Sequence, residues 1–142
     1  MNDNFINDQK VRDEIVIYIN NLLKEVNKKV ILNYFNNLNS NQIFTKTSDD
    51  DFVSIADKKS EELISKALIG FLNIKNFIGE ESSYSEKIKY NTLLNKPFVW
   101  VVDPIDGTKN YINGKDTFCS MISLVSFSIP IATFIYCPLK KL

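Results

Sequence analysis

Histidine is absent from this chain of 142 residues, and its absence removes several kinds of active site. Histidine is the commonest general base, the usual partner of serine and cysteine nucleophiles, and the commonest zinc ligand. Any catalysis by this chain must therefore depend on carboxylates, hydroxyls or hard cations.

Cysteine is scarce, with only Cys119 and Cys137. Two cysteines make neither a disulfide framework nor a CxxC metal site. We expect reduced thiols in a cytoplasmic protein, with one bridge between them as the alternative. The first ten residues, MNDNFINDQK, also lack the basic and apolar stretches of a secretory signal.

Net charge is absent too, because 17 basic residues balance 17 acidic ones. A neutral chain exerts no net field on nucleic acid or on an acidic membrane, so neither is an expected partner. What the chain does have is a hydrophobic content of 44%, enough for one folded domain.

Charge is missing altogether from Thr117–Leu139, a run long enough to span a bilayer. Four serines and Pro130 interrupt the run, which is rich in β-branched and aromatic residues. These features predict two buried strands, Phe118–Val125 and Ile129–Tyr136, joined by a turn around Phe127–Pro130. A small membrane-anchored protein is the alternative.

Helical periodicity marks the first segment, which should begin after Asn7 or Asp8 and end near Tyr34. Its apolar stripe consists of Val11, Ile15, Tyr18, Leu22, Val26 and Val30, with Ile19 and Leu23 beside it. Short β-type runs follow at Ile43–Thr47 and Phe52–Ile55. A second amphipathic helix should bury Ile64, Ala67, Leu68 and Phe71.

Two further strands are predicted at Phe77–Gly79 and Phe98–Val102, the second being an unbroken apolar run typical of a strand buried on both faces. A polar loop should follow the first of them. The order of elements predicts an α+β fold with two N-terminal helices packed on a mostly antiparallel sheet.

The segment richest in chemistry is Asp103-Pro104-Ile105-Asp106-Gly107-Thr108, directly after the second of these strands. Pro104 limits the turn so that Asp103 and Asp106 can converge, with the Ile105 carbonyl between them. Two carboxylates and a carbonyl form a hard, all-oxygen ligand set that suits Mg²⁺ better than zinc.

The residues that follow fit a phosphate site. Gly107 can adopt a positive φ, and Thr108 can open a short helix whose N–H groups suit an anion. The alternative is an ordinary surface turn, since Asp-Gly after a strand is common turn chemistry.

Three other acidic residues, in two segments, are candidates. Glu80 and Glu81 follow a strand, and one of them could bridge a metal and its water, although adjacent charges usually mark a solvated loop. Asp57, with Ser54 ahead of it and a helix behind, is expected to be an N-cap.

These segments in this order resemble the inositol monophosphatase family. The resemblance lies in FIGEES at Phe77–Ser82 and WVVDPIDGT at Trp100–Thr108. Further matches are Lys46, Asp51–Asp57, Phe118, Ser123-Leu124 and Cys137-Pro138. It implies a layered sugar-phosphatase fold over nearly all of the chain.

The resemblance also implies roles for individual residues. The implied Mg²⁺ ligands are Glu80, Asp103, the Ile105 carbonyl and Asp106. Thr108, paired with Asp57, would activate the attacking water together with Glu80. Asp103 and the backbone N–H groups of Gly107 and Thr108 would bind the substrate.

The implied reaction is Mg²⁺-dependent hydrolysis of a small phosphomonoester. The substrate would be an inositol monophosphate, with a 3′-phosphorylated nucleotide, histidinol phosphate or a fructose bisphosphate as alternatives. The chain departs from the family by carrying Ser54 in place of a threonine, and by lacking a glycine in the turn Phe127–Pro130 and another in the strand near Ala132.

Family chains continue for about another equal length. We therefore expect residues 1–142 to be the N-terminal portion of a domain, ending before a C-terminal α/β half that carries a further metal-binding aspartate. Activity would then be impaired, and a homodimer or a separately encoded C-terminal half would be the protein partner. The alternative is a non-catalytic remnant or binding module.

Overall fold

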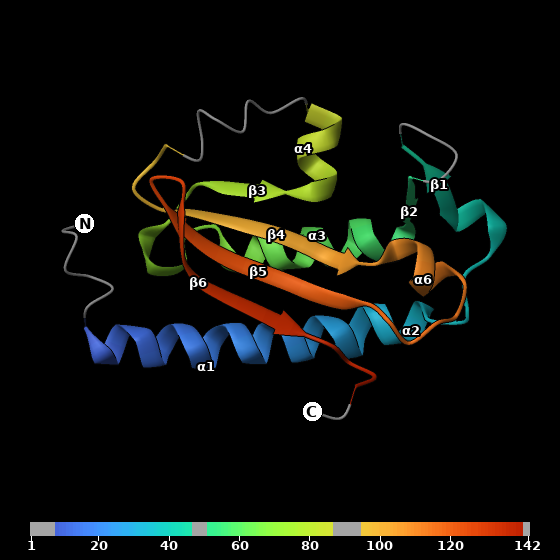
Figure 1. The fold of residues 1–142 in the computed structure, drawn as a ribbon, viewed down its shortest axis with the longest axis horizontal. Coiled ribbons are helices and arrows are strands. Elements are labelled where there is room, and N and C mark those ends of the chain that lie inside the picture. The colour runs from blue at the N-terminus through green and yellow to red at the C-terminus, as the bar shows by residue number, and fades with distance from the viewer. Residues whose placement is uncertain (1–7, 47–50, 87–94, 141–142) are drawn as a thin grey trace.

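The computed structural model describes residues 8–46, 51–86 and 95–140, drawn as a ribbon in Figure 1. The helices are α1 (Gln9–Val26), α2 (Leu32–Tyr34), α3 (Ile55–Leu68), α4 (Glu80–Glu86) and α6 (Thr108–Ile112). Asn27–Ile31 forms a π turn, and Ser40–Gln42 and Phe71–Asn73 form 3-10 turns. The strands are β1 (Ile43–Thr45), β2 (Phe52–Ser54), β3 (Phe77–Gly79), β4 (Val99–Asp106), β5 (Cys119–Ser126) and β6 (Ile129–Tyr136).

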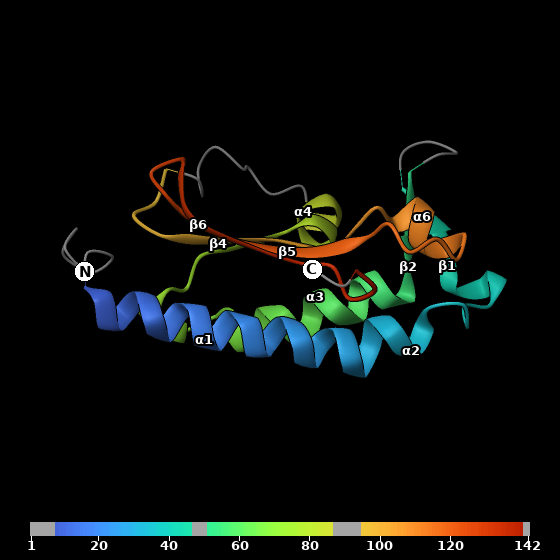
Figure 2. The ribbon, with the colours of Figure 1, turned by 60° about the horizontal axis from the view of Figure 1, so that its bottom comes forward.

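The strands form two sheets. Strands β1 and β2 make an antiparallel pair, and β3, β4, β5 and β6 lie in that order in a four-stranded sheet. Only the β3–β4 pairing is parallel among the described strands. Helices α1 and α3 lie side by side under one face of the larger sheet (Figure 2). The predicted α+β fold, with two N-terminal helices on a mostly antiparallel sheet, is confirmed.

The first helical segment begins and ends where the sequence predicts. Asp8 is the N-cap and accepts a hydrogen bond from the Lys10 N–H at 2.8 Å. The path continues to Tyr34 through the π turn, in which the Leu32 N–H donates to the Asn27 carbonyl. The buried residues of α1 are Ile15, Ile19, Leu23 and Val26. The buried stripe is therefore centred on Ile19 and Leu23, which the sequence placed only beside it.

A buried tyrosine ties this π turn to the far end of β4. Tyr111 of α6 is 1% exposed, and its hydroxyl donates to the Ile31 carbonyl at 2.7 Å. Burial raises the pKa of the Tyr111 hydroxyl, which therefore stays protonated as a donor. The helix and the segment after β4 are thus joined inside the core.

Helix α3 starts three residues earlier than predicted. Ser54, not Asp57, is its N-cap, and the Ser54 hydroxyl accepts from the Ala56 N–H at 3.1 Å. Because Ser54 begins the helix, the strand predicted at Phe52–Ile55 ends at Ser54. Ile64 and Leu68 are buried as expected, whereas Ala67 is only half-buried.

The prediction of a buried central strand holds for β4. Trp100 is fully buried, lies in register with Phe77 on one side and Leu124 on the other, and stacks on Phe71 at 6.1 Å between ring centroids. The strand runs on to Asp106, four residues past its predicted end. Its register with β5 shifts between Asp103 and Asp106, where Pro104 has no N–H to donate.

The uncharged run Thr117–Leu139 folds as the hairpin of β5 and β6. β6 has the predicted bounds, and β5 lies one residue later than predicted. Among the described residues, no helix is long and apolar enough to cross a membrane. The strand interpretation of this run is therefore confirmed, but only β5 is buried as predicted: no residue of β6 is buried, and Ile129 and Ile135 are 64% and 58% exposed.

The face of the larger sheet that points away from α1 and α3 is hereafter the outer face. Register pairing places Ile78, Val101, Met121, Ser123, Thr133 and Ile135 on it. Neither α1 nor α3 covers this face, and Ile135 is 58% exposed. Within the described chain, Ile78, Val99 and Val125 form a buried apolar cluster on this face, whereas its β6 side, at Thr133 and Ile135, is exposed to solvent.

Candidate active site

The candidate site lies where β4 ends and α6 begins. Gly107 has φ +88°, and a Cβ there would approach the Thr117 carbonyl oxygen to 2.9 Å. Only glycine fits both the left-handed backbone and this close approach. Thr108 then opens α6, so the predicted positive φ and the predicted short helix are both confirmed.

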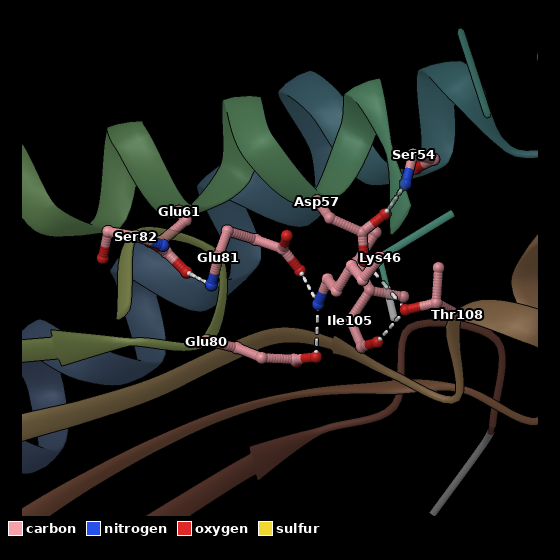
Figure 3. A network of polar contacts seen from close by, with 9 residues as sticks. All are labelled: Lys46, Ser54, Asp57, Glu61, Glu80, Glu81, Ser82, Ile105 and Thr108. Atoms are coloured by element: carbon pink, nitrogen blue, oxygen red, sulfur yellow. Dashed lines mark hydrogen bonds and ion pairs between the residues drawn. The ribbon is translucent and has the colours of Figure 1, made fainter. Parts of the chain in front are cut away.

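Behind this turn, Thr108 and Asp57 form a buried polar network (Figure 3). The Thr108 hydroxyl lies 2.9 Å from Asp57 Oδ1 and 2.8 Å from the Ile105 carbonyl oxygen. Asp57 Oδ2 accepts from the N–H of Ser54 at 2.8 Å and from its hydroxyl. Asp57 therefore holds the third position of the helix in a capping box, not the N-cap position predicted for it.

Asp57 is 1% exposed, and burial raises the pKa of its carboxyl despite the hydrogen bonds from Ser54 and Thr108 that oppose the shift. A threonine hydroxyl has one proton and here two acceptors. When the Ile105 carbonyl oxygen binds another group, the Thr108 hydroxyl donates its hydrogen bond to Asp57. The Thr108 oxygen is then free to accept a hydrogen bond from a water.

Asp103 is a second carboxyl group of the site whose pKa is raised. Burial, reinforced by the charges of Glu80, Asp106 and Asp57, raises the pKa of Asp103 to about 8. Within the part of the chain that the structure describes, its buried Oδ1 has no hydrogen-bond partner. Clustered carboxylates with an unpartnered, buried oxygen fit a hard divalent cation, which would supply the missing positive charge.

Glu80 and Glu81 begin α4, where the sequence predicted a polar loop. The Lys46 ammonium lies between them, 2.7 Å from each carboxylate, with its side chain 5% exposed. Burial alone would lower the pKa of Lys46, but the two carboxylates raise it overall. Burial raises the pKa of Glu81 to about 7, although Lys46 pulls in the opposite direction.

The predicted ligands and phosphate-binding residues line one cavity of about 240 Å³. They are Glu80, Asp103, Ile105, Asp106, Gly107 and Thr108, joined by Asp51, Phe52 and Lys109. In residues 8–46, 51–86 and 95–140, no three His, Cys, Asp or Glu side chains already stand in metal-binding geometry. Glu80 lines this cavity and is also paired with Lys46.

Two other hollows differ in their lining. One, of about 320 Å³, shares Glu80 and Asp103 with the acidic cavity but is otherwise lined by residues of the sheet such as Val101 and Met121. Another, of about 640 Å³, lies along α1 and includes Ile17, Tyr18 and Ala67. Neither contains Asp106, Gly107 and Thr108, so the smaller acidic cavity is the candidate site.

Three polar residues near the cavity were missed from the sequence or left without a role: Lys46, Glu61 and Cys119. Lys46 matched the family pattern but suggested no function. The Cys119 thiol donates to Asp106 Oδ2 at 3.7 Å, and burial raises the pKa of Cys119 to about 12. Neither Cys119 nor Cys137 is bridged in the structure.

Glu61 is buried on α3 at 5% exposure, and a charged residue on the apolar stripe of a helix is the signal that could have identified it.

Comparison with known proteins identifies the family of the chain. The sequence model of the inositol monophosphatase family matches residues 12–142. The chain belongs to this family.

Individual relatives match part of this chain. The chain is 37% identical over 90 residues to a fructose-1,6-bisphosphatase/inositol-1-monophosphatase of Aquifex aeolicus, covering 63% of this chain and 31% of that protein. It is 33% identical to the bifunctional phosphatase IMPL2 of Arabidopsis thaliana, covering 87% of this chain and 33% of that one.

The fold of this inositol monophosphatase family member is that of solved relatives. An IMPase of Thermotoga maritima superposes with a TM-score of 0.73 at 22% identity, over 89% of this chain and 45% of that chain. The chain thus spans about a third of the length of these two curated relatives and under half of this solved structure.

Proposed function

We propose that the chain carries the metal-binding and phosphate-binding part of an Mg²⁺-dependent phosphomonoesterase. The observation that carries the proposal is the acidic cavity in which Asp103 has a buried oxygen without a hydrogen-bond partner in the described chain. Membership of a phosphatase family supports the same reaction.

Four oxygen donors fit a bound Mg²⁺ ion: the Glu80, Asp103 and Asp106 carboxylates and the Ile105 carbonyl. The ion would supply Lewis-acid chemistry at the phosphate and at the attacking water. This donor set needs no histidine and no thiol, in keeping with the composition of the chain.

The chain's own residues would handle the water and the phosphate. Thr108 would donate its proton to Asp57 and accept one from the water, because Asp57 is fixed by Ser54 and cannot turn away. Glu80 would take part in activating the same water. The N–H groups of Gly107 and Thr108, at the start of α6, together with Asp103, would orient the phosphate ester.

The substrate that we propose is a small phosphorylated polyol or sugar. The Aquifex relative is named for fructose-1,6-bisphosphate and inositol 1-phosphate, which supports this class over a nucleotide or histidinol phosphate. A homodimer or a second polypeptide that completes the cavity is the protein partner that we propose, and the exposed β6 side of the outer face is consistent with either.

The metal site is tested by calorimetry with Mg²⁺ and Mn²⁺. We expect binding on the order of millimolar, since few carboxylates contribute, and its loss in Asp103→Asn. Asp116→Asn is the matched control, because Asp116 is exposed and does not line the cavity. Equal binding by the wild type and Asp103→Asn would refute the site.

Catalysis is tested by phosphate release from several small phosphomonoesters in Mg²⁺. We expect the chain alone to turn over far below an ordinary enzyme's ~10 s⁻¹, because the cavity is open and holds few contacts for the alcohol part of the ester. Turnover near that rate, abolished in Asp106→Asn, would show that the chain alone is sufficient.

A further inference from the structure

Glu61 occupies an unusual place on α3. It follows Asp57 by one helical turn, is 5% exposed, and lies beside the core residue Ile64. Its carboxylate accepts hydrogen bonds from the backbone N–H groups of Glu81 at 2.7 Å and Ser82 at 2.8 Å (Figure 3). A side chain of α3 thus satisfies the free N–H groups in the first turn of α4.

Gly79 shows how closely the two elements fit. A Cβ at Gly79 would lie 2.2–2.6 Å from the Glu61 carboxylate atoms, which no real Cβ tolerates. Glycine at this position leaves room for the carboxylate to reach the α4 amides. Any side chain there would push the Glu61 carboxylate away from them.

The residue between these contacts is Glu80. It lies after Gly79 and before Glu81, so its backbone is fixed on one side by the β3–β4 pairing and on the other by Glu61. A helix cap alone could be provided by a local serine or asparagine. Here the cap comes from the helix that also carries Asp57, so one rigid element sets both the Thr108 and the Glu80 sides of the cavity.

We propose that Glu61 is a positioning residue for the metal site: it fixes the start of α4 so that Glu80 faces the cavity. This proposal rests on the proposed function, because it assigns a purpose to Glu80 as a ligand. Glu61 itself does not line the cavity and touches neither metal nor substrate.

The test measures Mn²⁺ affinity by the electron paramagnetic resonance of free Mn²⁺, at a temperature where circular dichroism shows each variant folded. Glu61→Gln turns one acceptor oxygen into a donor and should weaken Mn²⁺ binding about tenfold, the low end for residues that orient metal ligands. Glu62→Gln is the matched control, since Glu62 is the next residue and its side chain is 62% exposed. The Mn²⁺ affinity of the Glu62→Gln variant should equal that of the wild type.

Gly79→Ala gives an independent approach that keeps the carboxylate but displaces it. It should weaken Mn²⁺ binding to a similar extent, and the double variant with Glu61→Gln should bind no more weakly than either single variant. Faster exchange of the Glu81 and Ser82 amide protons, followed by NMR, should accompany the loss in both single variants.

A folded Glu61→Gln chain with wild-type Mn²⁺ affinity overturns the proposal, as does full additivity of the two substitutions. A loss of thermal stability without any change in affinity would mean that Glu61 only caps α4, and also overturns it. If the wild type itself binds no Mn²⁺, the proposed function fails first, which is a separate result seen without any variant.

Discussion

Asp103 and Glu81 make the stability of the metal-free protein dependent on pH. Their folded pKa values of about 8 and about 7 lie above the ordinary carboxyl range, so the folded state binds these protons more tightly than the unfolded state. The stability contributed by these two groups is therefore fully present below about pH 4, and it is lost as the pH rises through 7 and 8. In EDTA, we expect the midpoint temperature of unfolding to decrease as the pH is raised from 5 to 8.5.

Calorimetric scans of Asp103→Asn should show a shallower fall over that range, because an amide does not titrate. Asp116→Asn, at an exposed aspartate, should keep the wild-type slope. A slope unchanged in Asp103→Asn would mean that other groups cause the pH dependence.

Trp100 reports on the core beneath the site. Trp100→Ala should cost about 3–5 kcal/mol in urea unfolding followed by circular dichroism, because it leaves a cavity between the sheet and Phe71. Trp100→Phe should cost less, since the indole N–H is buried without a hydrogen-bond partner within the described chain and its loss breaks none. Similar costs for the two variants would contradict this account.

Single residues were predictable from sequence where their type is tied to a backbone need. Gly107 needs a positive φ, and the spacing of Asp103 and Asp106 around a proline brings both to one cavity. Glu61 was missed although it lies on the apolar stripe of α3, because an acid in a helical repeat ordinarily faces solvent. Its partners, the amides of Glu81 and Ser82, are some 20 residues away in the chain.

The turn of the β5–β6 hairpin contains two residues whose types disfavour its left-handed backbone conformation. Phe127 has φ +46° and Ser128 has φ +68°, as in the tight turns that favour Asn-Gly. Ser128→Gly should raise the free energy of unfolding by roughly 0.5–1 kcal/mol, because left-handed backbone strains any residue with a Cβ.

Thermal unfolding of Ser128→Gly and Ser128→Ala separates backbone strain from the side chain. Both variants lose the hydroxyl contact to Asn95, and only glycine relieves the strain. Equal midpoints for the two variants would show that the positive φ at this position carries no cost.

Elements with a clear hydrophobic period were predicted to within a residue or two, as for α1 and β6. Helix α4 was missed because its sequence, EESSYSE, has no apolar stripe and takes its start from a carboxylate on α3. The extension of β4 through Pro104 was also missed, since proline usually ends a strand. In both cases a contact from a distant segment overrides the local pattern.

The exposed β6 side of the outer face bears on self-association. We expect reversible self-association, detected as a rise in mean mass with concentration by sedimentation, because Ile135 is exposed on β6, an edge strand of the described sheet. Ile135→Lys should weaken this association markedly.

Ile17→Lys is the control for this experiment. Ile17 is 63% exposed, similar to Ile135, but lies on α1 in the other layer of the molecule. Association that responds to Ile17→Lys and not to Ile135→Lys would place the contact on the helical layer instead.

The π turn at Asn27–Ile31 gives the molecule a tolerance to changes in length. Such a turn closes its hydrogen bonds over one residue more than an α turn, so it absorbs an inserted residue without changing the angular phase of the helix on either side. Deletion of the exposed Lys28 would leave a regular α turn, with the stripe of α1 still facing the sheet. The same deletion within α1 would rotate part of that stripe by about 100° away from the core. A change of one residue at the π turn should therefore leave Tyr111 in its place in the core.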